Sequence, residues 1–340
     1  MSPSGETITV KKGENLLKAG LEAGLAWPHD CRVGSCGTCR TKLLSGKIKE
    51  LNDFSYVLDK DELDAGMILA CQTALRSDVE VEVQLDTDHV QQPIKVVPGV
   101  IDTYKPLTHD IVEIGVQLDE PLPLYMAGHY ADIAVPGSID KPRNYSFAEA
   151  PDGGEVRHVS FFVRLVPGGE MTTWLHEQDR QGQRVQVSGP YGTFFLRESE
   201  APIVCIAGGS GLAPIKALLE QLAAEGFKRK TVFLFGARTQ KDLYCLDEMK
   251  AFEEQGKGNF EFIPVLSEEP DDSDWRGRRG LVTEFVAEAV PDVKACHAYL
   301  CGPPPMVDAA IATLGEQGLG KESIFFDKFL DASHLPGGRH

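Results

Sequence analysis

Three cysteines near the start of the chain are close enough in sequence to bind one metal centre. Cys31, Cys36 and Cys39 follow the pattern C-x4-C-x2-C, and Cys71 comes further along. This is the spacing of plant-type [2Fe–2S] centres, in which cysteine thiolates hold the irons. Gly34 permits backbone angles that let amide groups of the loop approach the centre. The spacing therefore predicts four cluster ligands.

A zinc site or a set of unrelated buried thiols is the alternative interpretation of these cysteines. Structural zinc sites usually pair two short hooks, each holding two ligands a few residues apart. The chain has a single loop of this kind, and Cys71 stands apart from it. We therefore favour the [2Fe–2S] interpretation.

A second group, Arg143-Asn144-Tyr145-Ser146, has the chemistry to bind a dinucleotide. It lies on a predicted strand, and residues two apart on a strand face the same way, so Arg143 and Tyr145 point to one side. A guanidinium forms paired hydrogen bonds with a pyrophosphate, and a tyrosine ring stacks on a flat heterocycle. Taken alone, the pair is equally compatible with a surface arginine beside a core tyrosine.

Glycine turns follow this strand at two places. Gly168 and Gly169 precede Thr172 and a predicted helix start, where backbone N–H groups favour an anion. Gly189 and Gly192 enclose a Pro-Tyr pair further on. The plainer alternatives are a hairpin turn for the first segment and the corner of a β-barrel for the second.

Another glycine-rich turn lies between a predicted strand and a predicted helix. Gly208, Gly209 and Gly211 follow an apolar strand, and Pro214 suits the first turn of a helix. Glycine amides and a helix N-terminus together form a cradle for a pyrophosphate. The spacing differs from the G-x-G-x-x-G fingerprint of ordinary dinucleotide-binding folds, so this turn alone is weak support.

A matching element follows about 90 residues later, where Cys301, Gly302 and Pro303 again separate a strand from a helix. Two such turns at the carboxyl ends of parallel strands predict a crevice for a dinucleotide. Cys301 either lies near the nicotinamide of that dinucleotide or is a small buried core thiol.

The elements that position these residues fall into three blocks. The first block has alternating strands at 7–10 and 79–83, a strand at 41–44 and helical spacing over 14–23, which predicts a small α+β sheet domain. Residues 95–197 contain short strands, such as 111–116 and 159–166, separated by Gly and Pro turns. That pattern is typical of an antiparallel β-barrel.

From residue 201 onward, strands and helices alternate, which predicts a parallel sheet flanked by helices. The predicted strands are 202–207, 231–235, 261–266 and 298–301, and the predicted helices are 214–224, 247–254, 283–289 and 306–314.

Composition limits the classes of function. The 340 residues carry a formal net charge of −17, which argues against nucleic acid as a partner. The N-terminus has neither the basic start nor the apolar run of a signal peptide, and no stretch is long enough to span a membrane. We expect a soluble, cytoplasmic monomer, in which eight cysteines serve as ligands or free thiols.

Four motifs, in their order along the chain, resemble the reductase components of bacterial multicomponent oxygenases. They are the cysteine loop, the Arg143–Ser146 group, the Gly208 turn and the Cys301 element, and the resemblance covers nearly the whole chain. Phenol hydroxylase, toluene monooxygenase and methane monooxygenase reductases are of this kind, within the ferredoxin–NADP reductase superfamily. The resemblance implies a β-grasp-like [2Fe–2S] ferredoxin domain at 1–90, an FAD-binding barrel at 95–197 and an NAD-binding α/β domain at 198–340.

The resemblance also implies roles for single residues. Arg143 would bind the flavin pyrophosphate, Tyr145 would stack on the isoalloxazine, and Ser146 would lie near its N5. Gly169 and Thr172 would lie at the FAD phosphates. The nicotinamide coenzyme would be held by the two glycine turns, whose residues are Gly208, Gly209, Gly211, Pro214, Cys301, Gly302 and Pro303.

Two details of the resemblance depend on what this chain carries. The family often places an aromatic residue near the C-terminus against the flavin, and Phe329 is the candidate, although further residues follow it. Phosphate-preferring relatives usually have a Ser-Arg pair after the second strand of the NAD domain, where this chain has Gly236-Ala237-Arg238. This favours NADH, although Arg238 could still meet a 2′-phosphate.

We therefore predict an NADH-dependent reductase that passes electrons from FAD through the [2Fe–2S] cluster to an oxygenase component. A di-iron hydroxylase acting in aromatic hydrocarbon catabolism is the favoured partner. A Rieske-type ring dioxygenase and a sugar-deoxygenation enzyme are the alternatives. A redox-sensing interaction protein is a more distant one, because it would leave both dinucleotide elements without a use.

Overall fold

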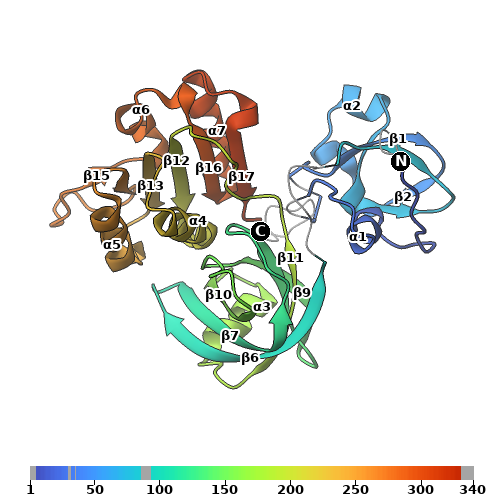
Figure 1. Ribbon diagram of the computed structural model, residues 1–340, viewed down its shortest axis with the longest axis horizontal. Helices are drawn as coiled ribbons and strands as arrows, with labels where there is room; N and C mark the ends of the chain where they lie inside the picture. Colours follow the sequence, from blue (N-terminus) through green and yellow to red (C-terminus); the bar gives the residue numbers. More distant parts are fainter. Residues whose placement is uncertain (1–4, 30–31, 35, 86–92, 331–340) are drawn as a thin grey trace. The chain divides into compact units, whose positions relative to one another are not determined.

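The computed structural model of the chain describes residues 5–29, 32–34, 36–85 and 93–330. The chain forms two compact units (Figure 1). The first comprises Met1–Lys95 together with the short segment Gly189–Thr193 and the C-terminal residues from Leu330, and the second comprises Val96–Ser188 and Phe194–Phe329.

The first unit is a small α+β domain with two antiparallel sheets, one in the order β3-β1-β5 and one of β2 and β4. Helix α1 begins after Asn15, whose side chain accepts the Lys18 N–H. Its apolar side packs on a core that includes the buried ring of Trp27. The bounds are α1 Leu16–Glu22, β1 Arg40–Ser45, β2 Ile48–Glu50, α2 Lys60–Asp64, β3 Met67–Leu69, β4 Thr73–Leu75 and β5 Glu80–Glu82.

The prediction of a strand at 7–10 was wrong. These residues are described, and none of them is in a strand. Ile8 and Val10 are partly buried against the core, which explains the alternating pattern. Pairing with β4 occurs only later, at Asn15 opposite Ala74. The alternating apolar pattern therefore reflects burial of one side of this segment and not pairing with a neighbouring strand.

The second unit begins with a six-stranded antiparallel sheet in the order β10-β7-β6-β11-β8-β9, with α3 following β10 in the chain. Its core lies on one face of the curved sheet and contains Phe147 and Phe161. The bounds are β6 Lys95–Pro106, β7 Ile111–Leu122, β8 Tyr130–Val135, β9 Ile139–Ser146, β10 Val156–Arg164, α3 Glu170–Glu177 and β11 Arg184–Tyr191.

The second unit ends with a six-stranded parallel sheet in the order β15-β14-β13-β12-β16-β17, as the alternating pattern predicted. Cys205 faces a core shared with α4 and α5, whereas its neighbour Val204 faces a core shared with α6 and α7 (Figure 1). The bounds are β12 Ile203–Gly208, α4 Leu212–Ala224, β13 Thr231–Ala237, α5 Leu246–Gly256, β14 Phe260–Leu266, β15 Arg278–Arg279, α6 Val286–Ala289, β16 His297–Gly302, α7 Pro304–Glu316 and β17 Ile324–Lys328.

The strand order places a topological switch at the middle of this sheet. The chain moves outward from β12 to β15 and then returns to place β16 on the other side of β12. In open α/β sheets, ligands bind outside the carboxyl ends of the strands at such a point. The two predicted glycine turns follow β12 and β16, so the topology brings them to one place.

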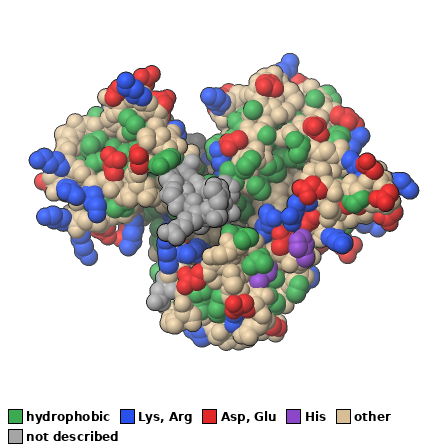
Figure 2. Space-filling view, turned by 180° about the vertical axis from the view of Figure 1, so that it is seen from behind, with side chains coloured by type: hydrophobic (Ala, Val, Ile, Leu, Met, Phe, Trp, Pro, Cys, Tyr) green, Lys and Arg blue, Asp and Glu red, His purple; other side chains and the backbone are tan. Residues whose placement is uncertain are grey.

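The exposed surface carries charges of both signs. Figure 2 shows acidic and basic side chains interspersed over the face that it draws. Among the helices of the described residues, none combines the length and the apolar character that crossing a bilayer requires.

Candidate functional site: three cofactor sites

The cysteine loop brings three of the four predicted ligands into one region of the first unit. Cys39 and Cys71 are buried, and Cys36 is partly exposed. The Sγ of Cys39 accepts the N–H of Cys71 at 3.5 Å, so these residues are adjacent although 32 positions separate them. Cys31 lies outside the described residues.

Backbone and side-chain N–H groups point at these sulfur atoms. The Thr38 N–H lies 3.5 Å from the Sγ of Cys36, and the Gln72 Nε2 lies 3.7 Å from the Sγ of Cys71. N–H donors stabilise thiolates, and thiolates are the ligands of a [2Fe–2S] cluster. The donor set and its surroundings therefore fit such a cluster.

Gln72 connects several parts of the cysteine loop, and no sequence pattern indicated this role. Its Nε2 also donates to the carbonyl of Arg32 at 3.2 Å, while its Oε1 accepts from Asn52 at 2.9 Å. Gly34 has φ +82°, and a Cβ there would meet the Gln72 side chain. The loop therefore packs on the buried side chain of Gln72, and the close contact leaves room only for a glycine at position 34.

The segment Gly189–Thr193 packs on the same loop region. The Gly192 N–H donates to Nε2 of buried His29 at 3.4 Å, and the other ring nitrogen of His29 lies 2.7 Å from the carbonyl of Trp27. The guanidinium of Arg32 lies over the ring of Tyr191 at 3.8 Å. From the sequence we expect only a flavin-site turn or a barrel corner here, so these contacts with the cysteine loop are a finding of the structure.

The predicted flavin residues lie on β9, at the edge of the antiparallel sheet. Arg143 and Tyr145 face the same way and are opposite Ile133 and Ala131 on β8. The Nη1 of Arg143 donates to the carbonyl of Lys141 at 2.9 Å. Burial raises the pKa of Tyr145, so the phenol stays protonated at neutral pH.

Thr172 lies on helix α3, which contacts β9. Its hydroxyl accepts the Val166 N–H at 3.1 Å and lies 3.2 Å from the Gly169 carbonyl. Gly169 is the N-cap of α3 and is close enough that a Cβ there would press on the Thr172 hydroxyl. Thr172 thereby holds the turn at the start of α3, and the N-terminus of a helix is a place where backbone N–H groups favour an anion.

The two glycine turns of the parallel sheet are packed against each other. A Cβ on Gly211 would collide with the Cys301 carbonyl, and one on Gly302 would lie 2.8 Å from the Gly208 oxygen. Gly209 begins a single 3-10 turn that leads into α4, with Pro214 in its first turn. The Gly209 carbonyl accepts a hydrogen bond from the buried Tyr244 hydroxyl at 2.8 Å, which no sequence pattern indicated.

Two residues near these turns have buried or half-buried side chains. Cys301 is fully buried on β16 beside Ala207, and burial raises the pKa of its thiol well above the ordinary value. The Phe329 N–H donates to the Gly302 carbonyl at 2.9 Å, and its ring packs on the same core as Cys301. Phe325 stacks on Tyr299 in that core.

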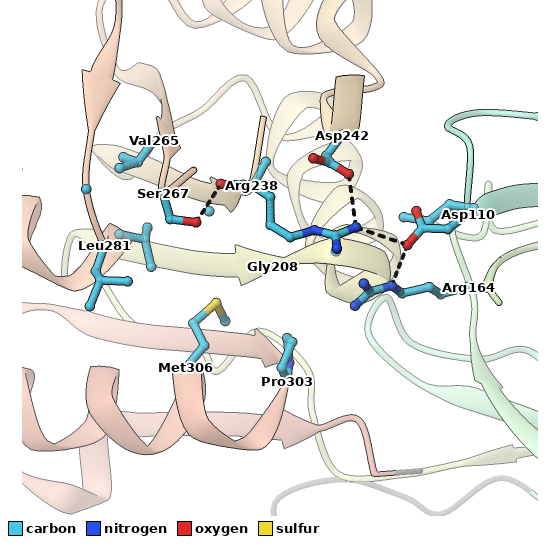
Figure 3. A pocket seen from close by; sticks show the side chains of 16 residues that line it. Asp110, Arg164, Gly208, Arg238, Asp242, Val265, Ser267, Leu281, Pro303 and Met306 are labelled. Carbon is cyan, nitrogen blue, oxygen red and sulfur yellow. Dashed lines mark hydrogen bonds and ion pairs between the residues drawn. The ribbon is translucent and has the colours of Figure 1, made fainter. Parts of the chain in front are cut away.

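A cavity of about 270 Å³ opens at the carboxyl ends of β12, β13 and β14 (Figure 3). Gly208, Gly209 and Pro303 line one part of it, and Arg238 and Ser267 line another. Arg238 follows β13, as the sequence placed it. The cavity gives room at the switch point for an extended anionic ligand such as a dinucleotide.

Three family models match the chain in the order that its elements suggest. The 2Fe-2S iron-sulfur cluster binding domain matches residues 1–76, the oxidoreductase FAD-binding domain matches 98–196, and the oxidoreductase NAD-binding domain matches 205–311. Glycine cradles, a thiolate-stabilising loop and these matches define an electron-transfer oxidoreductase that uses a [2Fe–2S] cluster, FAD and NADH.

Curated relatives specify the class further. The chain is 43% identical over 96% of its length to the xylene/toluene monooxygenase electron transfer component XylA of Pseudomonas putida, of which the match covers 91%. It is 36% identical over 99% of its length to the phenol 2-monooxygenase reductase component DmpP of Pseudomonas sp. (strain CF600), covering 95% of it. The chain belongs to the family of reductase components of multicomponent monooxygenases.

Solved structures agree with this assignment. A crystal structure of the Amycolatopsis cytochrome P450 reductase GcoB superposes with a TM-score of 0.86 at 33% identity, covering 96% of this chain and 97% of that one. The ferredoxin reductase of carbazole 1,9a-dioxygenase gives a TM-score of 0.78 at 27% identity, with 96% of each chain covered. The protein is thus an NADH-dependent reductase that supplies electrons to a hydroxylase.

Proposed function

We propose that this chain carries electrons from NADH to the di-iron hydroxylase of an aromatic-hydrocarbon monooxygenase. The observation that carries the proposal is the ordered set of three sites, each with geometry that suits its own redox group. The names of the two monooxygenase relatives, which act on xylene or toluene and on phenol, support an aromatic substrate.

In this proposal Cys31, Cys36, Cys39 and Cys71 bind the cluster. Arg143 binds the FAD pyrophosphate, Tyr145 flanks the flavin ring and Ser146 lies near its reactive edge. Gly169 and Thr172 form the turn at the FAD phosphates. The remaining residues, which hold the nicotinamide coenzyme or close its site, are Gly208, Gly209, Gly211, Pro214, Arg238, Cys301, Gly302, Pro303 and Phe329.

The bound cofactors carry out the redox chemistry, and the protein side chains position them. When bound, FAD takes up a hydride and releases electrons one at a time, as a [2Fe–2S] cluster requires. The side chains bind, orient and shield the groups, and no acid–base residue is needed. Cys301 contributes as a neutral, buried thiol, because its raised pKa keeps it protonated.

We propose domain boundaries at 1–90, 95–197 and 198–340, which the three family matches support. We propose further that the antiparallel sheet closes into a barrel between its two edge strands. An antiparallel bridge between Phe147 and Phe161 and the hydrogen bond from the Ala148 N–H to the Ser160 carbonyl support closure there. A cytoplasmic monomer and a β-grasp arrangement of the first unit remain our predictions.

The substitution Cys36→Ser tests the order of electron flow. It should leave NADH-driven reduction of ferricyanide within about twofold of wild type, because that acceptor takes electrons from the flavin. Reduction of cytochrome c or of the hydroxylase should fall to the background rate, with the loss of iron from the protein. Cys245→Ser removes a thiol of the second unit and should change neither activity.

Either of two results would contradict the proposal. Loss of both activities with FAD still bound would show that the flavin does not receive electrons first. Unchanged cytochrome c reduction would remove Cys36 from the set of ligands. A Rieske-type dioxygenase is the alternative partner, and the name of the carbazole 1,9a-dioxygenase reductase supports a dioxygenase. Which oxygenase component sustains substrate turnover with this reductase decides between the two partners.

A further inference from the structure

An ion-pair network lines the cavity next to the first glycine turn (Figure 3). The Oδ2 of Asp110 lies 2.9 Å from Nε of Arg164 and 3.6 Å from Nη2 of Arg238. The same Nη2 of Arg238 lies 3.3 Å from Oδ1 of Asp242. One carboxylate therefore bridges two arginines whose side chains face the cavity.

The two carboxylates are much less exposed than the arginine between them. The side chains of Asp110 and Asp242 are 16% and 13% exposed, whereas that of Arg238 is 46% exposed. Thr108 donates to Asp110 at 3.0 Å, and the hydroxyl of Thr239 donates to Asp242 at 2.9 Å. The acids are thus fixed in place, while the arginine that they hold reaches into the open part of the cavity.

Asp110 is a charged group within this network. Burial raises its pKa, but the hydrogen bond and the charge of Arg164, the Thr108 hydroxyl and nearby His109 together outweigh burial, and the pKa lies below its ordinary value. His109 lies 3.7 Å from the Oδ1 of Asp242. Apart from His109, the network pairs two carboxylates with two guanidinium groups.

This pairing matters because the cavity also contains the glycine turn. Arg164 lies within 3.6 Å of the position that a Cβ of Gly209 would occupy. A phosphate held by the amides of the Gly209 turn would be next to Arg164, in the same cavity that Arg238 lines. Guanidinium groups bind phosphates by charge-assisted hydrogen bonds. Such a phosphate must compete with Asp110 for these groups.

We propose that Asp110 is a positioning residue that withholds Arg164 and Arg238 from the phosphates of the nicotinamide coenzyme and thereby sets its affinity. Asp110 comes from the turn between β6 and β7, in the part of the chain that binds flavin, and not from the NAD-binding part. The proposal rests on the proposed function in one respect, namely that this cavity receives the coenzyme.

The phosphate concerned is either the pyrophosphate or a 2′-phosphate, and small competitors separate the two. ADP carries a pyrophosphate and no 2′-phosphate, whereas adenosine 2′,5′-bisphosphate carries a 2′-phosphate and no pyrophosphate. The inhibition constant of each is measured against NADH with ferricyanide as acceptor. AMP provides the reference inhibition constant, because it carries the adenosine and the 5′-phosphate that both competitors share.

In the holoenzyme with Asp110→Asn, we expect ADP, adenosine 2′,5′-bisphosphate or both to bind about threefold to tenfold more tightly. The KM for NADH or NADPH should fall accordingly, with kcat changed less. Asp119→Asn is the matched control, because Asp119 on β7 pairs with Arg184 on β11 and is not among the residues that line the cavity. Asp119→Asn should leave all constants unchanged.

A merely structural role for Asp110 predicts weaker binding on its removal, so constants that are unchanged or larger overturn the proposal. The gain must also vanish when Asp110→Asn is made in an Arg164→Gln/Arg238→Gln background, and its persistence there would overturn it too. The proposed function fails separately, if wild-type protein does not oxidise NADH or if ADP does not compete with it.

Discussion

Gln72 shows how one buried amide can adjust a redox centre. Its Nε2 donates to the sulfur of Cys71, and Asn52 fixes the orientation of the amide by donating to its oxygen. Reduction adds negative charge to a cluster, and donors to the sulfur atoms stabilise that charge. Gln72 is therefore expected to raise the reduction potential of the cluster.

We predict that Gln72→Leu lowers this potential by tens of millivolts, roughly the effect of one hydrogen bond. A redox titration followed by electron paramagnetic resonance measures the change. Asn52→Ala, which removes the orienting donor, should give a smaller shift of the same sign. A potential that rises, or one that is unchanged with the cluster intact, would rule out the role.

At the scale of elements, the two glycine turns work as one unit because β12 and β16 are neighbours in the sheet. A side chain on Gly211 would collide with the carbonyl of Cys301, which is backbone and cannot turn aside. The turn after β12 would have to move away from the turn after β16. The close approach of the two backbones explains why residue 211 is a glycine, and the conformational freedom of glycine is not required here.

We predict that Gly211→Ala raises the KM for NADH about tenfold or more and lowers the free energy of unfolding by about 1–3 kcal/mol. Steady-state kinetics and chemical denaturation measure the two effects. Gly315→Ala on α7, where a Cβ meets nothing within 4 Å, should leave the KM unchanged and stabilise slightly. Equal effects of the two substitutions would contradict the proposed packing.

At the scale of the whole molecule, the net charge of −17 governs encounters with protein acceptors. Charges of opposite sign accelerate association, and salt screens them over a Debye length. Cytochrome c is a basic acceptor, and ferricyanide is an anion. The two acceptors should therefore respond to salt in opposite directions.

Raising the salt from about 0.01 M to about 0.2 M should slow cytochrome c reduction several-fold and leave ferricyanide reduction unchanged or faster. Stopped-flow mixing of the NADH-reduced protein with each acceptor gives both rates. A parallel decrease for the two acceptors would mean that salt acts on the cofactors or the coenzyme and not on the encounter.

Much of the fold was predictable because its signals are local. Full burial of β12 on both faces required a continuous apolar run, and the alternation of strands and helices then predicted the parallel sheet. The prediction of a strand at 7–10 was wrong. An apolar residue at every second position indicates that one side is buried, as Ile8 and Val10 are, but it does not show that a partner strand is present. The cysteine and glycine motifs were visible for a similar reason, because their chemistry depends on spacing within one loop.

The amino-acid sequence alone was enough to predict which redox groups this protein binds and the order of their domains along the chain. The folded chain was needed to see which distant residues lie against these motifs: Gln72 at the sulfur of Cys71, Tyr244 at the Gly209 turn and Asp110 between two arginines. Such contacts join residues far apart in the chain and leave no periodic pattern in the sequence. They exist because the strand order brings side chains within hydrogen-bonding distance, and hydrogen bonds weaken steeply with small changes in geometry.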